Sequence, residues 1–170
     1  IEAMLKKGTF YVPSMLFLKK LIGVSESGVA RELQVVPVKR SFEHMCRMLP
    51  KANAAGVKIV PGDDFGLEFM MHAPGNYAEE LEIYVNDCGI PARDVLTWTT
   101  RNGGLMMGRS DLGMIREGYV ADLVVVNGDP CENISLLRDV ANLEMIVKDG
   151  KVHKNTLASA PARAKELAPA

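Results

Sequence analysis

The sequence predicts an α/β fold followed by a smaller region built mainly of strands, and three observations lead to this prediction. A helical pattern ends at Gly56 and is followed at once by a short apolar run at residues 57–60, which is the rhythm of a β/α unit. A second aromatic and β-branched run occupies residues 9–12. After residue 110 the chain changes to short β-rich runs between glycine turns. The two parts therefore differ in fold class.

The first 60 residues predict three helices and two strands. Residues 1–7 have a short helical pattern that stops at Gly8, and the run at 9–12 is a strand that Pro13 ends. Residues 15–48 are apolar at three- and four-residue spacing, with a polar turn and a proline that divide them into two helices. The strand at residues 57–60 completes this part.

A tight turn at residues 61–66 follows the second strand. The carboxyl end of a strand is where α/β folds place their chemistry, so this turn is the candidate site. Two further helices are expected at residues 77–87 and from Pro91 to about residue 102.

The last third predicts strands at residues 113–115, 121–126 and 143–153. Asp149-Gly150 interrupts the third of these runs and is a strong signal for a two-residue hairpin turn. The Ala/Pro/Lys-rich tail after Asn155 is expected to form a terminal helix or to fray.

Composition excludes several classes of protein. With 20 Lys+Arg against 21 Asp+Glu in 170 residues, the net charge of −1 gives no basic footprint for nucleic acid. No apolar run approaches the ~18 residues of a membrane span. Cys46, Cys88 and Cys131 are far apart and form no CxxC pair, which favours reduced thiols and a cytoplasmic location. Because the chain begins without Met and in mid-pattern, we expect it to start partway through a larger protein or a processed one.

Two segments carry a resemblance to a known family. Residues 56–66, GVKIVPGDDFG, are similar to a last barrel strand that ends in G-T-D-x-G. Residues 112–130 match the pattern G-x-I-x-x-G-x-x-A-D-L-V-V-x-x-G-D-P. Residues 79–103 and the run at 9–14 extend the similarity. The chain thus resembles the C-terminal part of the amidohydrolase superfamily, in its imidazolonepropionase-like and Xaa-Pro dipeptidase-like branch.

The resemblance implies a fold for each part of the chain. Residues 1–110 would be the C-terminal part of a metal-dependent (β/α)8 TIM barrel, with its last two strands, and residues 111–155 part of a small β-sandwich domain. Residues 156–170 would be a tail or helix. Because a whole barrel needs ~250 residues, this chain would require the missing N-terminal half of the barrel, or a homo-oligomer, as its partner.

The resemblance also implies a role for Asp64, which falls at the family's catalytic aspartate. There it would bind a divalent metal, zinc by analogy and one or two ions, and shuttle the proton of a metal-activated water. The alternative is a carboxylate that caps the next helix. Asp63 replaces the family's threonine and would support the site from outside the metal's coordination sphere or serve the turn. A shift of one residue in register would exchange the two roles.

The histidines are too few for the family's metal site. The resemblance implies a site of four histidines, a carboxylated lysine and an aspartate, with the first two histidines in an H-x-H motif. This chain has only His44, His72 and His153, and no H-x-H. Most metal ligands are therefore expected outside this chain. His72 would contact substrate or hold its loop through hydrogen bonds, and the other two would be structural or surface residues.

The expected function is hydrolysis of a carbon–nitrogen bond in a small substrate, such as a dipeptide or an N-acyl amino acid, with this segment alone incomplete for catalysis. The alternative is a non-catalytic or regulatory chain that retains the amidohydrolase scaffold and acts by association.

Overall fold

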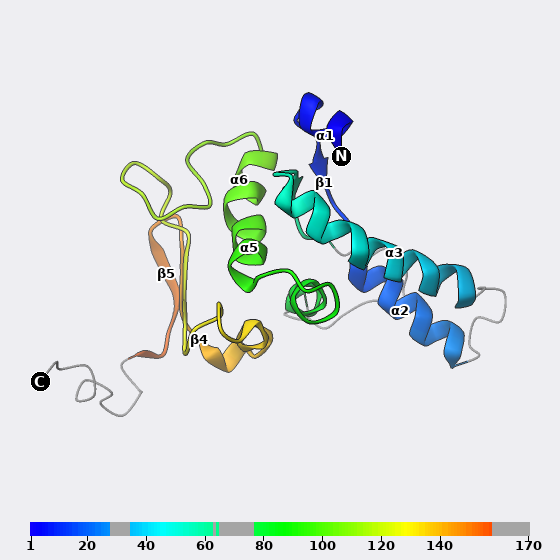
Figure 1. Ribbon diagram of the computed structural model, residues 1–170. Coiled ribbons are helices and arrows are strands. Elements are labelled where there is room, and N and C mark those ends of the chain that lie inside the picture. The colour runs from blue at the N-terminus through cyan, green and yellow to red at the C-terminus, as the bar shows by residue number, and fades with distance from the viewer. Residues whose placement is uncertain (28–34, 63, 65–76, 158–170) are drawn as a thin grey trace, which may run out of the picture.

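The computed structural model describes residues 1–27, 35–62, 64 and 77–157 (Figure 1). Its first part alternates helices and strands, as predicted. The elements are α1 (Glu2–Lys7), β1 (Phe10–Tyr11), α2 (Met15–Glu26), α3 (Val35–Ala54) and β2 (Lys58–Ile59).

Two helical segments and a small sheet make up the second part. Helix α4 continues into the wider π-helical turn η2, and after a break α5 continues through a second such turn, η3, into α6. Two 3-10 turns, η4 and η5, precede the hairpin of the sheet. The elements are α4 (Ala78–Glu82), η2 (Ile83–Asp87), α5 (Ala92–Thr97), η3 (Trp98–Asn102), α6 (Gly103–Met106), β3 (Leu123–Val126), η4 (Ile134–Arg138), η5 (Val140–Asn142), β4 (Leu143–Lys148) and β5 (Lys151–Asn155).

Strands β1 and β2 pair in parallel, with Phe10 opposite Lys58 and Tyr11 opposite Ile59. The connection between them runs through α2 and α3, because parallel strands need a crossover. Helix α3 ends at Ala54. Gly56 follows with a φ of 83°, in the left-handed region, and its N–H donates to Asn53 O at 2.9 Å. The predicted sequence of helix, glycine and strand is confirmed.

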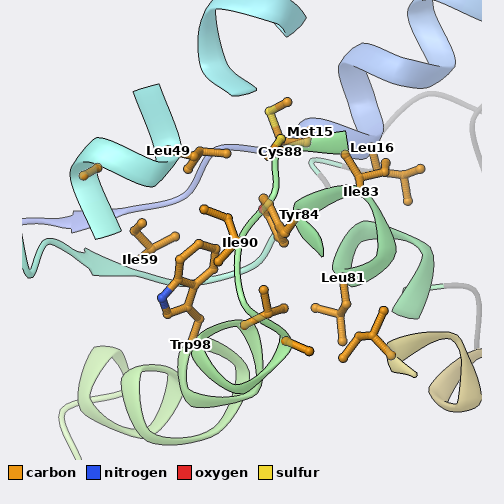
Figure 2. Close-up of a cluster of buried hydrophobic side chains, with 14 of the residues drawn as sticks. Met15, Leu16, Leu49, Ile59, Leu81, Ile83, Tyr84, Cys88, Ile90 and Trp98 are labelled. Atoms are coloured by element: carbon orange, nitrogen blue, oxygen red, sulfur yellow. The ribbon is translucent and has the colours of Figure 1, made fainter. Parts of the chain in front are cut away.

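The core lies between the parallel strands and the surrounding helices (Figure 2). Tyr84 and Trp98 meet edge to face, with ring centroids 5.4 Å apart. The largest fully buried side chains are Tyr84, Met15, Leu16, Leu49, Ile59, Ile83, Ile90, Glu80 and Val95.

The helix predicted from Pro91 to residue 102 extends further than expected, through α6 to Met106. Hydroxyl groups accompany its wider middle turns. Thr97, Thr99 and Thr100 donate to the carbonyls of Arg93, Val95 and Leu96 at 2.7–2.9 Å, and such bonds compete with the helical ladder.

The last third forms an antiparallel sheet in the order β3-β4-β5. The Asp149-Gly150 hairpin is confirmed, since both residues have positive φ angles of 52° and 71°. In Figure 1 the helical segment containing α5 and α6 stands between this sheet and the α2–α3 pair.

The strand predicted at residues 113–115 is wrong. Residues 113 and 114 form a bend and residue 115 has no regular structure, because Gly113 packs against the backbone of η3 instead of pairing with a strand. A Cβ at Gly113 would lie 2.2 Å from Thr100 O.

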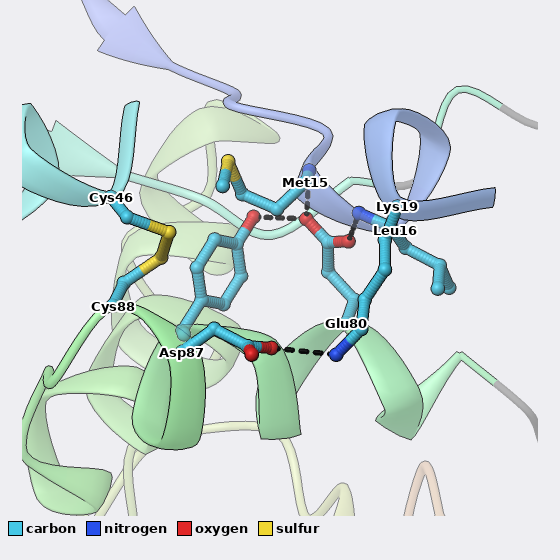
Figure 3. Close-up of a disulfide and its surroundings, with 8 residues drawn as sticks. Met15, Leu16, Lys19, Cys46, Glu80, Asp87 and Cys88 are labelled. Carbon is cyan, nitrogen blue, oxygen red and sulfur yellow. Dashed lines mark hydrogen bonds and ion pairs between the residues drawn. A yellow bond between two sulfur atoms is a disulfide. The ribbon is translucent and has the colours of Figure 1, made fainter. Parts of the chain in front are cut away.

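The cysteine prediction is also wrong for two of the three thiols. Cys46 of α3 and Cys88, which follows η2, form a disulfide with a Cα–Cα distance of 4.4 Å (Figure 3). They are 42 residues apart in sequence, and distance along a chain does not set distance in space. Cys131 is free and exposed.

The helices that the structure describes include none with the length and apolar character needed to span a bilayer.

Candidate functional site

The carboxyl ends of β1 and β2 meet at one edge of the parallel pair, and this edge is the candidate site. Val60, the residue after β2, donates its N–H to Tyr11 O at 3.0 Å. The two strands therefore remain hydrogen-bonded at their carboxyl ends. Burial raises the pKa of the Tyr11 phenol. The phenol therefore remains neutral over an even wider pH range.

Gly62 allows the two strand ends to approach this closely. A Cβ at Gly62 would lie 2.6 Å from Val12 Cγ1, which is closer than nonbonded carbons come. A side chain at residue 62 would thus force the side chain of Val12 to move.

Asp64 lies five residues after the end of β2 and is exposed. Its φ is 54°, a left-handed conformation that aspartate adopts more readily than most residues. The structure places the carboxylate at the carboxyl end of the strand, where the sequence predicted it. Asp63 and His72 lie outside the described residues.

Within the described ranges, no group of three or more His, Cys, Asp or Glu is placed to hold a metal ion. His44 is exposed on α3 and His153 is exposed on β5. Asp64 offers one carboxylate, and a single carboxylate does not hold a divalent ion by itself. The donors available here do not fit a complete metal site.

Polar side chains connect β2 and the end of α3 to the helix formed by α5 and η3. Asn102 Nδ2 donates to Ile59 O at 2.9 Å, which fixes the last residue of β2 to η3. Trp98 Nε1 donates to Asn53 Oδ1 at 3.1 Å, and Asn53 Nδ2 donates to Asp94 Oδ2 at 2.7 Å. The strand that leads to Asp64 is therefore held by hydrogen bonds as well as by apolar packing.

A cavity of about 350 Å³ opens beside the turn that follows β2. Pro61 and Gly62 form one wall, the start of α4 forms another, and Thr99 completes it. Most of its lining is apolar, and Glu80 is the charged residue among those that line it.

Glu80 is a buried carboxylate that was not among the site residues predicted from the sequence. It is 2 % exposed. Tyr84 and Ile83 follow it at helical spacings of four and three residues, so Glu80 lies on the apolar face of its helix. An acidic residue at an apolar position was the signal that could have identified it.

Two acidic residues of the 112–130 motif have structural roles in the small sheet. Asp122 accepts from Lys148 Nζ at 2.6 Å and from Asp149 N at 2.7 Å, which ties β3 to the hairpin turn. The hydrogen bond from Lys148 and that from the Asp149 backbone hold the pKa of Asp122 below its ordinary value. Asp129 accepts from Cys131 N at 2.7 Å and closes a turn.

The chain is similar to known proteins over most of its length. Ochratoxinase of Aspergillus niger is 27 % identical over 156 residues, which cover 90 % of this chain and 31 % of that protein. Its crystal structure superposes with a TM-score of 0.72 over 91 % of this chain and 34 % of its own. A Xaa-Pro dipeptidase with bound methionine in its active site superposes with a TM-score of 0.68 at 27 % identity, over 91 % of this chain and 36 % of that one.

The chain therefore spans about a third of the length of the relatives that it matches. The Amidohydrolase family matches residues 1–153, which is most of the chain and includes β1, β2 and the small sheet. This chain belongs to the amidohydrolase family.

Proposed function

We propose that the whole protein is a metal-dependent hydrolase that cleaves a carbon–nitrogen bond of a small substrate, with Asp64 in its catalytic site. The observation that carries this proposal is the position of Asp64, at the carboxyl end of a parallel strand in a chain of the amidohydrolase family. Asp64 is also exposed there, as a residue that meets substrate must be.

The role proposed for this chain is limited to Asp64 and its support. A divalent ion in such a site would supply a bound water of lowered pKa. Asp64 would contribute one ligand, take a proton on a carboxylate oxygen and return it to the leaving amine. The other donors would come from parts of the protein outside this chain. Zinc remains a prediction, as do the roles of Asp63 and His72.

The proposal includes a division of the chain. Residues 1–110 would supply the last two strands of a (β/α)8 barrel, 111–155 part of a β-sandwich, and 156–170 a tail or helix. The exposed side chains of β3 support this division, because Leu123, Val124 and Val125 are 36–54 % exposed. Such apolar strands normally pack against further structure. The N-terminal half of the protein, or a second copy, would cover them.

The substrate class follows from the relatives by analogy alone. A Xaa-Pro dipeptidase and an ochratoxinase both align over about nine tenths of this chain. We propose a dipeptide, an N-acyl amino acid or a related amide. The cytoplasmic location stays a prediction, and the Cys46–Cys88 disulfide removes the cysteine argument for it.

The decisive experiment replaces Asp64 with Asn in the full-length protein. We expect the loss of nearly all hydrolysis of dipeptides and N-acyl amino acids, with an unchanged far-UV circular dichroism spectrum, because the amide cannot take up the proton. Asp87→Asn is the matched control, since Asp87 carries an exposed ion pair with Lys19. Wild-type turnover in Asp64→Asn would refute the assignment.

The scaffold alternative is tested by the upstream sequence of the protein. An H-x-H motif, a strand-end lysine and two further strand-end histidines would favour the enzyme. If an upstream sequence lacks them, and the purified protein contains no metal, the non-catalytic function is favoured instead.

A further inference from the structure

Glu80 is the one charged residue in the buried core of the described chain, at 2 % exposure. A carboxylate is rarely buried to this extent unless it is paired or accepts several hydrogen bonds. Its neighbours Glu79 and Glu82 instead form ion pairs nearer the surface, with Lys20 and Arg138. Glu80 therefore requires hydrogen-bond donors inside the core, whereas its neighbours are paired near the surface.

Its carboxylate caps a helix that is remote in sequence (Figure 3). Met15 N donates to Oε1 at 2.9 Å, Leu16 N donates to Oε2, and the Tyr84 hydroxyl donates to Oε1. Met15 and Leu16 are the first residues of α2, where N–H groups have no partner within the helix. Ser14 at the N-cap has a left-handed φ of 48° and makes no side-chain capping bond. Glu80 thus replaces the local cap and also complements the positive end of the helix dipole.

This contact connects the two strand ends of the candidate site. Helix α2 begins four residues after β1, and α4, which carries Glu80, follows the segment that holds Asp64. The near end of that segment is fixed by the pairing of β2 with β1. Glu80 fixes the start of α4 to the helix that follows β1, and it lines the same cavity as Pro61 and Gly62. The exposed Lys19–Asp87 pair joins α2 to η2, which continues α4, but exposed pairs contribute little.

We propose that Glu80 is a positioning residue for Asp64. It fixes the start of α4 to the start of α2, beside Pro61 and Gly62 at the carboxyl ends of β1 and β2. The inference rests on the proposed function for its effect on turnover, whereas its structural part can be tested without any substrate.

The experiment compares Glu80→Gln with Glu82→Gln in the full-length protein. The first substitution keeps the size of the side chain but replaces one carboxylate oxygen with an NH2 group. That group is a donor and cannot accept from the backbone N–H of Met15 or Leu16. We expect faster hydrogen–deuterium exchange at the start of α2 and also across residues 57–64. We further expect kcat to fall about ten- to a hundredfold at unchanged KM, and Glu80→Asp to restore part of it. Glu82→Gln should change neither measurement.

Three results would overturn the inference, two in Glu80→Gln and one in a second variant. One is faster exchange confined to residues 14–18 with kcat unchanged, which describes a cap that stabilises α2 alone. The other is a fall in kcat that matches the unfolded fraction. If Glu80→Gln does not fold, Tyr84→Phe removes one donor only, and unchanged exchange at residues 57–64 in that variant overturns the inference. Wild-type protein without hydrolysis would refute the proposed function, and the exchange at residues 57–64 would still decide the role of Glu80.

Discussion

Gly113 lies where the loop after α6 crosses the backbone of η3. Its φ of 76° is left-handed, and a Cβ would lie 2.2 Å from Thr100 O and 2.9 Å from Arg101 N. Gly118 has a similar φ of 80° but nothing within 4 Å of its Cβ position. The two glycines therefore share the conformational requirement and differ in the space available.

We expect Gly113→Ala to lower the free energy of unfolding by about 1 to 3 kcal/mol more than Gly118→Ala does, because both variants adopt an unfavourable φ but only the first overpacks a backbone. Urea unfolding of the full-length protein measures the difference. Equal losses would show that the backbone of η3 can move away.

Asp122 makes the stability of the small sheet dependent on pH. The hydrogen bond from Lys148 comes first among the causes that hold its pKa below the ordinary value of 3.8. A lowered pKa in the folded state adds stability above the unfolded value, and this is lost as the pH falls through the folded value. Asp122→Asn should therefore flatten the dependence of unfolding free energy on pH below about pH 4.

Lys148→Ala provides the comparison for that experiment. It removes the donor from Lys148 but keeps the backbone N–H of Asp149, so an intermediate slope is expected in the acid unfolding series. A slope like that of the wild type in both variants would contradict the assignment.

At the scale of elements, the sequence predicted the helices and strands that depend on local patterns. The β/α unit ending at Gly56 and the hairpin at Asp149-Gly150 both follow from periodicity and turn chemistry. The strand at residues 113–115 failed because its apolar residues look like a strand locally, whereas the contact of Gly113 with Thr100 is made with another element. Such a contact between elements cannot be predicted from the local sequence.

The attachment of β2 to η3 gives a prediction at the same scale. Asn102→Ala leaves Ile59 O without its side-chain donor, and an unsatisfied buried carbonyl costs about 1 to 3 kcal/mol. We expect a loss of that size in chemical unfolding, and little change for the exposed neighbour Arg101→Ala. If both variants unfold at the same denaturant concentration, the hydrogen bond does not support the strand.

For the whole molecule, the candidate site was only partly predictable. Asp64 follows from a turn at the end of a strand, which is a local pattern. Glu80 acts on α2 across 64 and 65 residues of sequence, and the disulfide joins cysteines 42 residues apart. Both contacts depend on how whole helices pack together. The spacing of apolar residues predicts that the helices pack, but it does not predict which residues come into contact.

The disulfide gives the prediction at this scale. By the chain-entropy description, a loop of 42 residues corresponds to about 4 kcal/mol of stability. Replacing Cys46 and Cys88 with Ser, or adding reductant, should lower the thermal midpoint of the full-length protein, whereas Cys131→Ser should not. A thermal midpoint that is insensitive to reductant, with Cys46 and Cys88 both reacting as free thiols in denaturant, would show that the bond does not form in the protein.

The same bond would alter how the chain responds to a protease. A single cut anywhere between residues 46 and 88 would leave the two pieces tied together, so the damaged molecule would migrate as one band on a denaturing gel until a reductant separated it into two. The piece that contains Asp64 would then stay covalently attached to the rest of the chain after the backbone is cut.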